Sequence, residues 1–323
     1  MLDIKDLEGK IINADCMDIL KQLPDKCIDC ILTDPPYFGI VKKDWDNQWK
    51  NIQEFQSWVG AVGKELYRVL KDNGSFYWFG DDKTIAYCQV ELDKYFHLIN
   101  NVVWKKPELI SKKGCYSVFR SYAPMTERCL FYDKGEDKTG LDMVKSVIPN
   151  PFANYLQEEL LRKFCELKKA KNFVIKELNI SNALFDFWIK GERTITKEKW
   201  DLIREKIGYD YLTKKYEDLR REYEDLRRVW NNDEKAFDVL EFPFCVDIGR
   251  FHPTQKPISL ISYLLERSTN PDMIVLDCFS GSGTTAIACN RLKRRFICIE
   301  RDVEYWAKSC ERLKAEQAQL QLF

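Results

Sequence analysis

Two short segments decide how this chain folds: residues 33–37, Thr-Asp-Pro-Pro-Tyr, and residues 277–285, Asp-Cys-Phe-Ser-Gly-Ser-Gly-Thr-Thr. Each follows a short apolar run typical of a buried strand, at residues 28–32 and 273–276. The first segment is stiff, because proline fixes its own backbone angle and has no N–H group to donate. The glycines of the second segment let a small ligand approach the backbone closely. A rigid polar loop and a glycine-rich turn therefore each stand at the end of a predicted strand.

The composition bounds the possible functions. The 323-residue chain has 51 lysines plus arginines and 51 aspartates plus glutamates, so its formal net charge is +0. A nucleic-acid-binding function therefore needs a local basic face, because overall charge does not supply one. Hydrophobic residues make up 45% of the chain and aromatic residues 13%, which is enough for a real core and argues against general disorder. The length allows one large α/β domain plus a smaller unit.

The twelve cysteines are scattered through strand-like and helix-like runs. No cleavable signal segment opens the sequence, and no apolar run approaches transmembrane length. We therefore expect reduced, mostly buried thiols in an intracellular protein. Cys27 and Cys30 have zinc-type spacing, but Cys30 lies in a predicted strand and no second pair is suitably placed. Since the two histidines are His97 and His252, far apart in the chain, we expect no metal site.

Strand-like and helix-like runs alternate along the first 133 residues, which is the pattern of a doubly wound α/β sheet. The Asp-Asn-Gly sequence at residues 72–74 is a signal that ends the helix before it. We expect strands at residues 10–13, 27–33, 75–79, 98–104 and 128–132, and helices at residues 17–23, 55–70 and 83–94.

The character of the chain changes after residue 134. Helices are expected at residues 154–170, 173–178, 182–190 and 196–207, followed by a seven-residue repeat at 216–228. From residue 242 the α/β pattern returns, with helices at 258–267 and 284–291 and strands at 273–276 and 296–300. The prediction is one catalytic domain, residues 1–133 and 245–323, interrupted by a helical insertion at residues 134–244.

The two opening segments together resemble the DNA amino-methyltransferases, which move a methyl group from S-adenosylmethionine (SAM) to the exocyclic amine of adenine or cytosine. Their order, with Asp-Pro-Pro-Tyr first and the glycine turn last, is similar to that of the beta group of this family. The resemblance implies a circularly permuted, Rossmann-like methyltransferase sheet, in which the strand before Asp277 lies beside the strand before Asp34. A nicotinamide-binding fold is the alternative for a glycine turn, but it would show Gly-x-Gly-x-x-Gly and would not explain Asp-Pro-Pro-Tyr.

The resemblance also implies a SAM site assembled from distant segments. Lys256, in His-Pro-Thr-Gln-Lys-Pro, would pair with the methionine carboxylate of SAM. Glu300 lies 19 residues after Gly281 (300 minus 281), a spacing suited to binding two ribose hydroxyls. Most family members have proline where Cys278 stands, and a small residue suffices there. The cofactor-binding residues implied are Asp15, Cys16, His252, Lys256, Asp277, Phe279, Gly281, Gly283, Thr284 and Glu300.

The catalytic residues implied by the resemblance are Asp34, Pro35, Pro36 and Tyr37. The Asp34 carboxylate and the Pro35 carbonyl would accept both N–H bonds of the target amine and so localise its lone pair. Tyr37 would stack on a base flipped out of the duplex. Aspartate at the first position is commoner in adenine N6 enzymes and serine in cytosine N4 enzymes. Adenine N6 methylation of double-stranded DNA is therefore favoured, with cytosine N4 as the rival.

The loop at residues 38–50 contains Trp45 and Trp49. These tryptophans would form a lid or wedge over the target base, or else simply pack as part of a surface loop. The sequence favours neither interpretation.

The insertion contains a segment, residues 173–191, that resembles the helix-turn-helix of phage-repressor domains. Between Leu161 and Lys206 there are twelve basic and seven acidic residues, an excess of five (12 minus 7), which suits contact with phosphates. The expected DNA-binding residues are Lys190, Arg193 and Arg120. The alternative is a helical spacer whose aromatic residues are simply core. The repeat at residues 216–228 is too short for an independent coiled coil, so we favour a helix packed on its own domain over a dimer seam.

A rival from another class is a non-catalytic helix-turn-helix regulator, which would need neither Asp34 nor the glycine turn. The favoured enzyme would be cytoplasmic and encoded by a prokaryote or phage, associated with the nucleoid through double-stranded DNA and not with a membrane. The sequence leaves open whether it is a homodimer and whether it has a cognate restriction nuclease.

Overall fold

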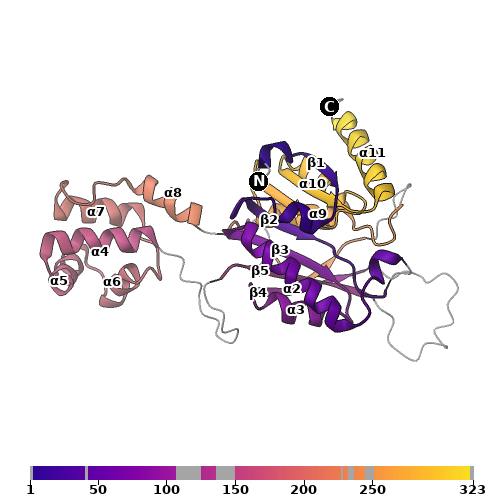
Figure 1. Ribbon diagram of the computed structural model, residues 1–323. Coiled ribbons are helices and arrows are strands. Elements are labelled where there is room, and N and C mark those ends of the chain that lie inside the picture. The colour runs from indigo at the N-terminus through magenta and orange to yellow at the C-terminus, as the bar shows by residue number, and fades with distance from the viewer. Residues whose placement is uncertain are drawn as a thin grey trace. The chain divides into compact units, whose positions relative to one another are not determined.

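The computed structural model describes residues 3–40, 43–106, 125–135, 150–226, 228–231, 236–243 and 251–320. The chain divides into two compact units, one made of Met1–Leu141 with Val229–Phe323 and the other of Asp142–Arg228. The first unit is a sheet with helices on both faces, and the second is helical (Figure 1).

The first unit contains one eight-stranded mixed sheet. Its strands are β1 (Lys10–Asn13), β2 (Ile28–Thr33), β3 (Leu70–Gly80), β4 (His97–Lys105), β5 (Thr126–Asp133), β6 (Val239–Glu241), β7 (Ile274–Asp277) and β8 (Arg295–Glu300). The order is β1-β8-β7-β2-β3-β5-β4-β6, with β5 antiparallel to both of its neighbours and the other pairs parallel. The doubly wound α/β sheet expected from the sequence is thus confirmed.

Strands β2 and β7 lie side by side although they come from distant parts of the chain. They pair in parallel, with Cys30 opposite Val275 and Ile31 opposite Leu276. This confirms the expected neighbourhood of the two opening segments. The side chain of Thr33 donates a hydrogen bond to Asp277 (Oγ1 to Oδ1, 2.9 Å), which ties the two strand ends together. In a doubly wound sheet, ligands bind beyond such C-terminal strand ends.

Helices cover both faces of the sheet because successive strand residues point to opposite sides. Ile31 packs in the core beneath α1 (Cys16–Leu20), α2 (Ile52–Val69) and α3 (Ile85–Leu92). The next residue, Leu32, packs in the opposite core beneath α9 (Ile258–Ser268), α10 (Thr284–Arg291) and α11 (Val303–Leu320). Figure 1 shows these two layers of helices around the sheet. Two short 3-10 helices are η1 (Ile4–Asp6), which precedes β1, and η2 (Asp44–Asp46), which lies in the loop between β2 and α2.

The structure corrects the expected start of β3. The strand begins at Leu70, directly after α2, whereas residues 72–74 were expected to separate helix from strand. These residues form an irregularity in the ladder, because Ile28 pairs with Leu70 and Cys30 pairs with Ser75. Gly74 is needed there for packing, since a Cβ atom would lie 2.5 Å from Leu70 Cδ1. Helix α11 was not among the expected elements.

The second unit consists of α4 (Pro151–Phe164), α5 (Leu167–Leu178), α6 (Asn182–Ile189), α7 (Lys197–Ile207) and α8 (Tyr216–Leu226). It has its own apolar core, which includes Phe152, Trp188 and Trp200. The single helix expected at residues 154–170 is wrong, because Cys165 takes a left-handed conformation (φ 60°) that ends α4. The insertion is also shorter than expected, since β6 pairs with β4 and belongs to the sheet.

The segments predicted as a helix-turn-helix and as a heptad repeat both lie in the second unit and form helices. Three residues separate α5 from α6; Asn179 ends α5 in a left-handed conformation, and the Ser181 side chain caps α6. Leu219 of α8 is fully buried in the core of this unit. Helix α8 therefore packs on its own domain, the interpretation favoured over a dimer seam.

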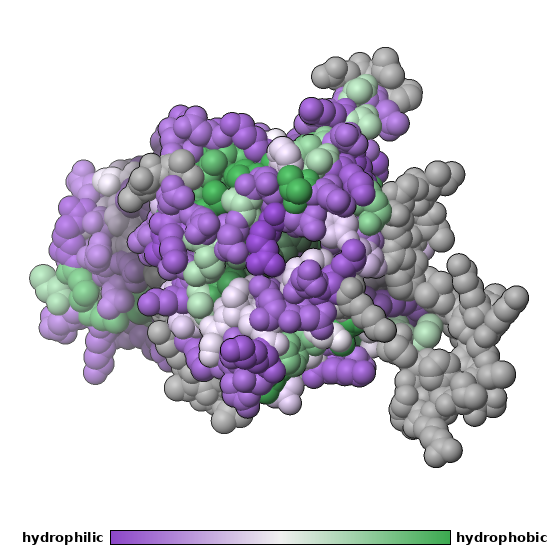
Figure 2. Space-filling model, turned by 45° about the vertical axis from the view of Figure 1, so that its right-hand side comes forward, coloured by the Kyte–Doolittle hydropathy of each residue, from purple (hydrophilic) through white to green (hydrophobic). Residues whose placement is uncertain are grey.

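The surface turned to the viewer in Figure 2 is mainly hydrophilic, with hydrophobic residues in small groups among hydrophilic ones. Within the described parts of the chain, no helix combines the length and apolar character needed to cross a membrane.

Candidate active site

A cavity of about 250 Å³ lies beyond the C-terminal ends of the central strands. The expected site residues that line it are Asp15, Cys16, Asp34, Pro35, Pro36, Tyr37, His252, Phe279, Gly281 and Glu300. Segments from both ends of the chain therefore meet around one cavity, as the sequence predicted.

Gly281 in the glycine turn and Glu300 at the end of β8 lie together at one wall of this cavity. The Glu300 carboxylate accepts hydrogen bonds from the backbone N–H of Gly281 (2.7 Å) and of Asp302 (2.8 Å). Burial raises the pKa of Glu300. Gly281 has a positive φ of +50°, and a Cβ atom there would lie 3.1 Å from His252 Nε2. Glycine is thus favoured both by the backbone angle and by the close approach of His252.

Asp15 and Cys16 supply another part of the wall. The Asp15 side chain caps α1 by accepting from Met17 N–H at 2.9 Å, and Arg301 Nη1 lies 3.8 Å from its carboxylate. Burial raises the pKa of the Cys16 thiol to about 12, so Cys16 is a neutral lining residue at physiological pH.

Asp277, Gly283 and Thr284 are expected cofactor-binding residues that do not line the main cavity but lie next to it. Asp277 accepts hydrogen bonds from Thr33, Thr285 and the backbone N–H of Phe279, and burial raises its pKa to about 6. Asp277 and Thr284 line a smaller adjoining hollow. Gly283 packs closely against Ser309 and Ile11. A Cβ atom at position 283 would lie 3.1 Å from Ser309 Cβ and 3.2 Å from Ile11 Cδ1.

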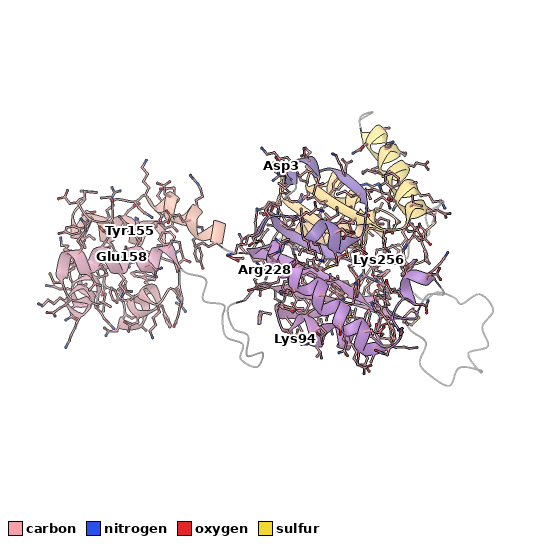
Figure 3. All side chains as sticks on the ribbon, in the orientation of Figure 1. Asp3, Lys94, Tyr155, Glu158, Arg228 and Lys256 are labelled. Carbon is pink, nitrogen blue, oxygen red and sulfur yellow. The ribbon has the colours of Figure 1, made fainter. Side chains whose placement is uncertain are left out.

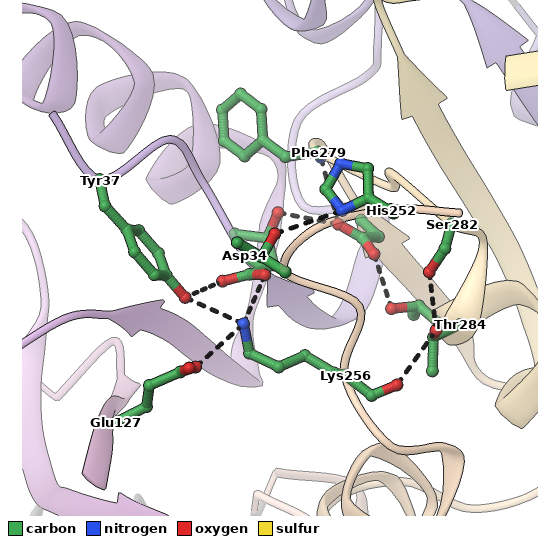
Figure 4. A network of polar contacts seen from close by, with 12 residues as sticks. Asp34, Tyr37, Glu127, His252, Lys256, Phe279, Ser282 and Thr284 are labelled. Atoms are coloured by element: carbon green, nitrogen blue, oxygen red, sulfur yellow. Dashed lines mark hydrogen bonds and ion pairs between the residues drawn. The ribbon is translucent and has the colours of Figure 1, made fainter. Parts of the chain in front are cut away.

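The carboxylate of Asp34 is held by two side chains. The Tyr37 hydroxyl donates to Asp34 Oδ1, and Lys256 Nζ donates to Asp34 Oδ2 at 2.5 Å (Figure 4). Burial raises the pKa of Asp34, and the positive charge of Lys256 counteracts that rise. Lys256 also lies 3.1 Å from Glu127 Oε2. The expected partner of Lys256 was the SAM carboxylate; the structure places its ammonium group against Asp34 and Glu127.

Asp46 holds the backbone that follows Asp-Pro-Pro-Tyr. Its buried carboxylate accepts from the N–H groups of Tyr37 (2.6 Å), Phe38 (3.0 Å) and Ile40 (2.7 Å). Phe38 has a positive φ of 69°, so this backbone needs such external support. Sequence reasoning missed Asp46, because an aspartate in a polar loop carries no signal that it is buried.

The two loop tryptophans differ in their surroundings. Trp45 lines the cavity and stacks on His252, with ring centroids 6.0 Å apart. Trp49 packs against Phe55 and Trp58 at 4.9 and 4.8 Å, as part of the apolar core. Ordinary packing therefore accounts for Trp49, whereas Trp45 is placed where a lid residue would be.

The helical unit exposes two of the expected DNA-binding side chains. Lys190, at the C-terminal cap of α6, and Arg193 are both exposed. The Arg193 guanidinium lies 4.9 Å from the Phe187 ring centroid. Tyr155, labelled on α4 in Figure 3, packs against Trp200 inside the same unit. Arg120 lies outside the described residues.

The family follows from a comparison of the whole chain with known proteins. A model of the DNA methylases that act on adenine N6 and cytosine N4 matches residues 28–311. The chain belongs to this DNA methylase family. The type II methyltransferase M2.DpnII of Streptococcus pneumoniae is 25% identical over 324 residues, covering 95% of this chain and 90% of its own length. The DNA adenine methyltransferase YhdJ of Escherichia coli K12 is 26% identical over 309 residues, covering 94% and 82%.

Solved structures support the methylase fold. The PvuII DNA methyltransferase, described as cytosine-N4-specific, has a TM-score of 0.54 at 17% identity, with 94% of this chain and 85% of that chain covered. The complex of M1.HpyAVI with SAM has a TM-score of 0.50 at 20% identity, with 94% and 98% covered. At these identities the likeness concerns the fold alone.

Proposed function

We propose that this DNA methylase transfers a methyl group from SAM to N6 of adenine in double-stranded DNA. The observation that carries the proposal is one cavity lined by the Asp-Pro-Pro-Tyr segment, by Gly281 of the glycine turn and by Glu300 at the end of β8. Asp34 and Pro35, the proposed acceptors for the target amine, thus line the same cavity as Glu300, the proposed acceptor for the ribose hydroxyls of SAM.

The residues of the cavity fit SAM. Glu300 keeps lone pairs free for ribose hydroxyls after accepting its two backbone N–H groups, because a carboxylate offers about four acceptor positions. Gly281 and Phe279 line the cavity, and Phe279 offers an apolar surface. When bound, SAM supplies a methyl group already activated by its sulfonium charge, so no covalent enzyme intermediate is needed.

Asp34 and Pro35 act on the target amine. That amine is a poor nucleophile, because its lone pair is delocalised into the base. Acceptors aimed at its two N–H bonds favour the pyramidal form and return the lone pair to nitrogen, and such preorganised contacts strengthen in the transition state. The base must leave the duplex to reach them. Tyr37, which lines the cavity, provides an aromatic ring for stacking.

Adenine is favoured over cytosine by two considerations. Aspartate stands at the first position of the segment, which is the commoner arrangement in adenine N6 enzymes. The relative YhdJ is a DNA adenine methyltransferase by name. Cytosine N4 is the second candidate, because the fold neighbour PvuII methyltransferase is described as cytosine-N4-specific.

The helical unit supplies phosphate contacts in this proposal. Its three-residue turn between α5 and α6 has the connectivity of a helix-turn-helix, in which the second helix enters the major groove. Lys190 and Arg193, both exposed after that second helix, would meet the DNA backbone.

Tritium transfer from labelled SAM to unmethylated double-stranded DNA tests this function. The DNA is then digested to nucleosides and separated by mass, which distinguishes N6-methyladenine from N4-methylcytosine. Label in N6-methyladenine is the expected result. Label in N4-methylcytosine would support cytosine N4 methylation instead. If no methyl group is transferred to DNA, the result would support the non-catalytic regulator.

A further inference from the structure

The ammonium group of Lys256 is buried next to the Asp34 carboxylate, and three oxygen atoms surround it. Its side chain is 5% exposed. Nζ donates to Asp34 Oδ2 at 2.5 Å and to the Tyr37 hydroxyl at 2.9 Å, and Glu127 Oε2 lies 3.1 Å away. Figure 4 shows these contacts converging on Nζ. An ammonium group has three N–H donors. Two of them make the hydrogen bonds to Asp34 and Tyr37, and Glu127 adds an ion pair.

Lys256 belongs to a group of four charged side chains whose charges balance. Glu127 of β5 also pairs with Lys106, which follows β4. Two carboxylates, Asp34 and Glu127, thus face two ammonium groups. Burial works against the charge of Lys256, but Asp34 and Glu127 outweigh it and raise the pKa of Lys256. Burial likewise opposes the charge of Glu127, and the two lysines lower its pKa. Each buried charge is therefore paired, as burial requires.

We propose that Lys256, held in place by Glu127, is a positioning residue that keeps the Asp34 carboxylate charged and oriented toward the target amine. The inference rests on the proposed role of Asp34 as an acceptor. A protonated Asp34 would present an O–H donor to the amine in place of an acceptor, so the reaction needs the charged form. Lys256 favours that form, and the Tyr37 hydroxyl fixes the other carboxylate oxygen.

Other charged and titratable groups face this site as well. They are Asp81, Lys106 and Cys129 from the β3–β5 side and Asp277 from β7. Among the groups acting on Asp34, Lys256 favours the charged form through both its charge and its hydrogen bond, while Glu127 disfavours it directly. The effect of Glu127 on catalysis must therefore pass through Lys256, because its direct effect has the opposite sign.

The test compares Lys256→Met, Lys256→Arg and the wild type in methyl transfer at saturating SAM and DNA across pH. An opposite charge at this distance lowers the pKa of an aspartate by about 1–3 units. Activity is lost as pH falls through the pKa of Asp34, so Lys256→Met should lose activity at a pH at least about one unit higher than the wild type. Lys256→Arg, which keeps the charge, should stay close to the wild type. SAM affinity, measured by calorimetry, should change less than about twofold in both.

The matched control is Lys71→Met, which removes a different ion pair of the same unit, 2.6 Å from Asp29 at the opposite end of β2. It should leave the pH profile unchanged. A Lys256→Met profile that coincides with the wild type overturns the proposal. The proposal is also overturned if Lys256→Met loses tenfold in SAM affinity while its pH profile of activity stays that of the wild type. That result would mean that Lys256 binds the carboxylate of SAM.

Glu127→Gln tests the second half of the proposal. If Glu127 acts through Lys256, the substitution should lower activity in the wild type by more than it does in Lys256→Met, and equal losses in both would overturn that half. A carboxyl carbon NMR titration of Asp34, assigned with Asp34→Asn, needs no turnover. Asp34 should titrate at lower pH in the wild type than in Lys256→Met, or, if that variant does not fold, than in Lys256→Gln. This readout judges the ion pair even if Asp34 proves not to act on the amine; equal titration would refute it.

Discussion

At the scale of single residues, Asp34 shows how the site balances burial against charge. Its carboxylate must be enclosed to exclude water from the amine, yet enclosure raises its pKa. Replacing Asp34 with Ala should abolish most methyl transfer while leaving much of the SAM binding intact, because its carboxylate acts on the base. Losing one preorganised group of this kind costs about 10²–10³ in rate. Single-turnover transfer from labelled SAM measures the loss, and a near-normal rate would refute the acceptor role.

Glu300 is the residue for which the cofactor prediction is sharpest. Replacing it with Ala should weaken SAM binding at least tenfold, since a hydrogen bond to a charged group contributes roughly 1.5–3 kcal/mol. The substitution also removes the acceptor of two hydrogen bonds, from the backbone N–H groups of Gly281 and Asp302. Calorimetric titration with SAM decides it, with the exposed Glu304 of α11 replaced by Ala as the control. Unchanged affinity in the Glu300 variant would mean that the ribose is held elsewhere.

At the scale of an element, the loop after Asp-Pro-Pro-Tyr depends on Asp46. Replacing Asp46 with Ala leaves three backbone N–H groups without their acceptor, and each such loss costs about 1–3 kcal/mol. We expect a marked drop in thermal stability and at least a tenfold loss of methyl transfer. SAM affinity should suffer less, because Glu300 and Gly281 lie on another loop. Thermal melts and transfer rates measure both, with Lys50→Ala as the control, and equal activity in the two variants would exclude this role.

Elements were predictable where local pattern and tertiary structure agree. The buried strands before Asp34 and Asp277 were evident as apolar runs closed by special turn residues. The end of α4 and the start of β3 were not, because both depend on packing. Cys165 takes a left-handed conformation without being glycine, and Gly74 makes room for Leu70 within a strand although its neighbours are typical of a helix end.

At the scale of the whole molecule, the parts of the site that carry unusual residue types were predictable from the sequence. Prolines, glycines and an acidic residue at a fixed spacing are visible in one dimension. The positions of Glu127 and Lys256 relative to Asp34 are not visible in this way. The pairing of β2, β3 and β5 brings Glu127 toward Asp34, whereas Lys256 comes from the segment before α9, 222 residues from Asp34 in the sequence. Charge on a strand residue such as Glu127 indicates exposure when only the sequence is known, whereas here it is the buried partner of two lysines.

The proposed role of the helical unit in DNA binding is open to a direct test. Replacing both Lys190 and Arg193 with Ala should weaken DNA binding and leave SAM affinity unchanged. If both side chains meet phosphates, the slope of log affinity against log salt should become shallower by about 0.9 for each phosphate interaction that is removed. The effect should be similar on specific and non-specific DNA, because phosphate contacts position the protein and do not read bases.

The matched control for that variant removes two lysines of the first unit, Lys26 and Lys94, whose charges are already paired with Asp72 and Glu91. Binding to a DNA duplex across a salt series should give the control and the wild type the same slope, and the Lys190 and Arg193 variant a shallower one. Three identical slopes would show that the likeness of α5 and α6 to a helix-turn-helix is structural only. In that case DNA would be held by other surfaces of this methylase, and the basic excess between Leu161 and Lys206 would serve only to solvate the unit, since charges that meet no phosphate release no counterions.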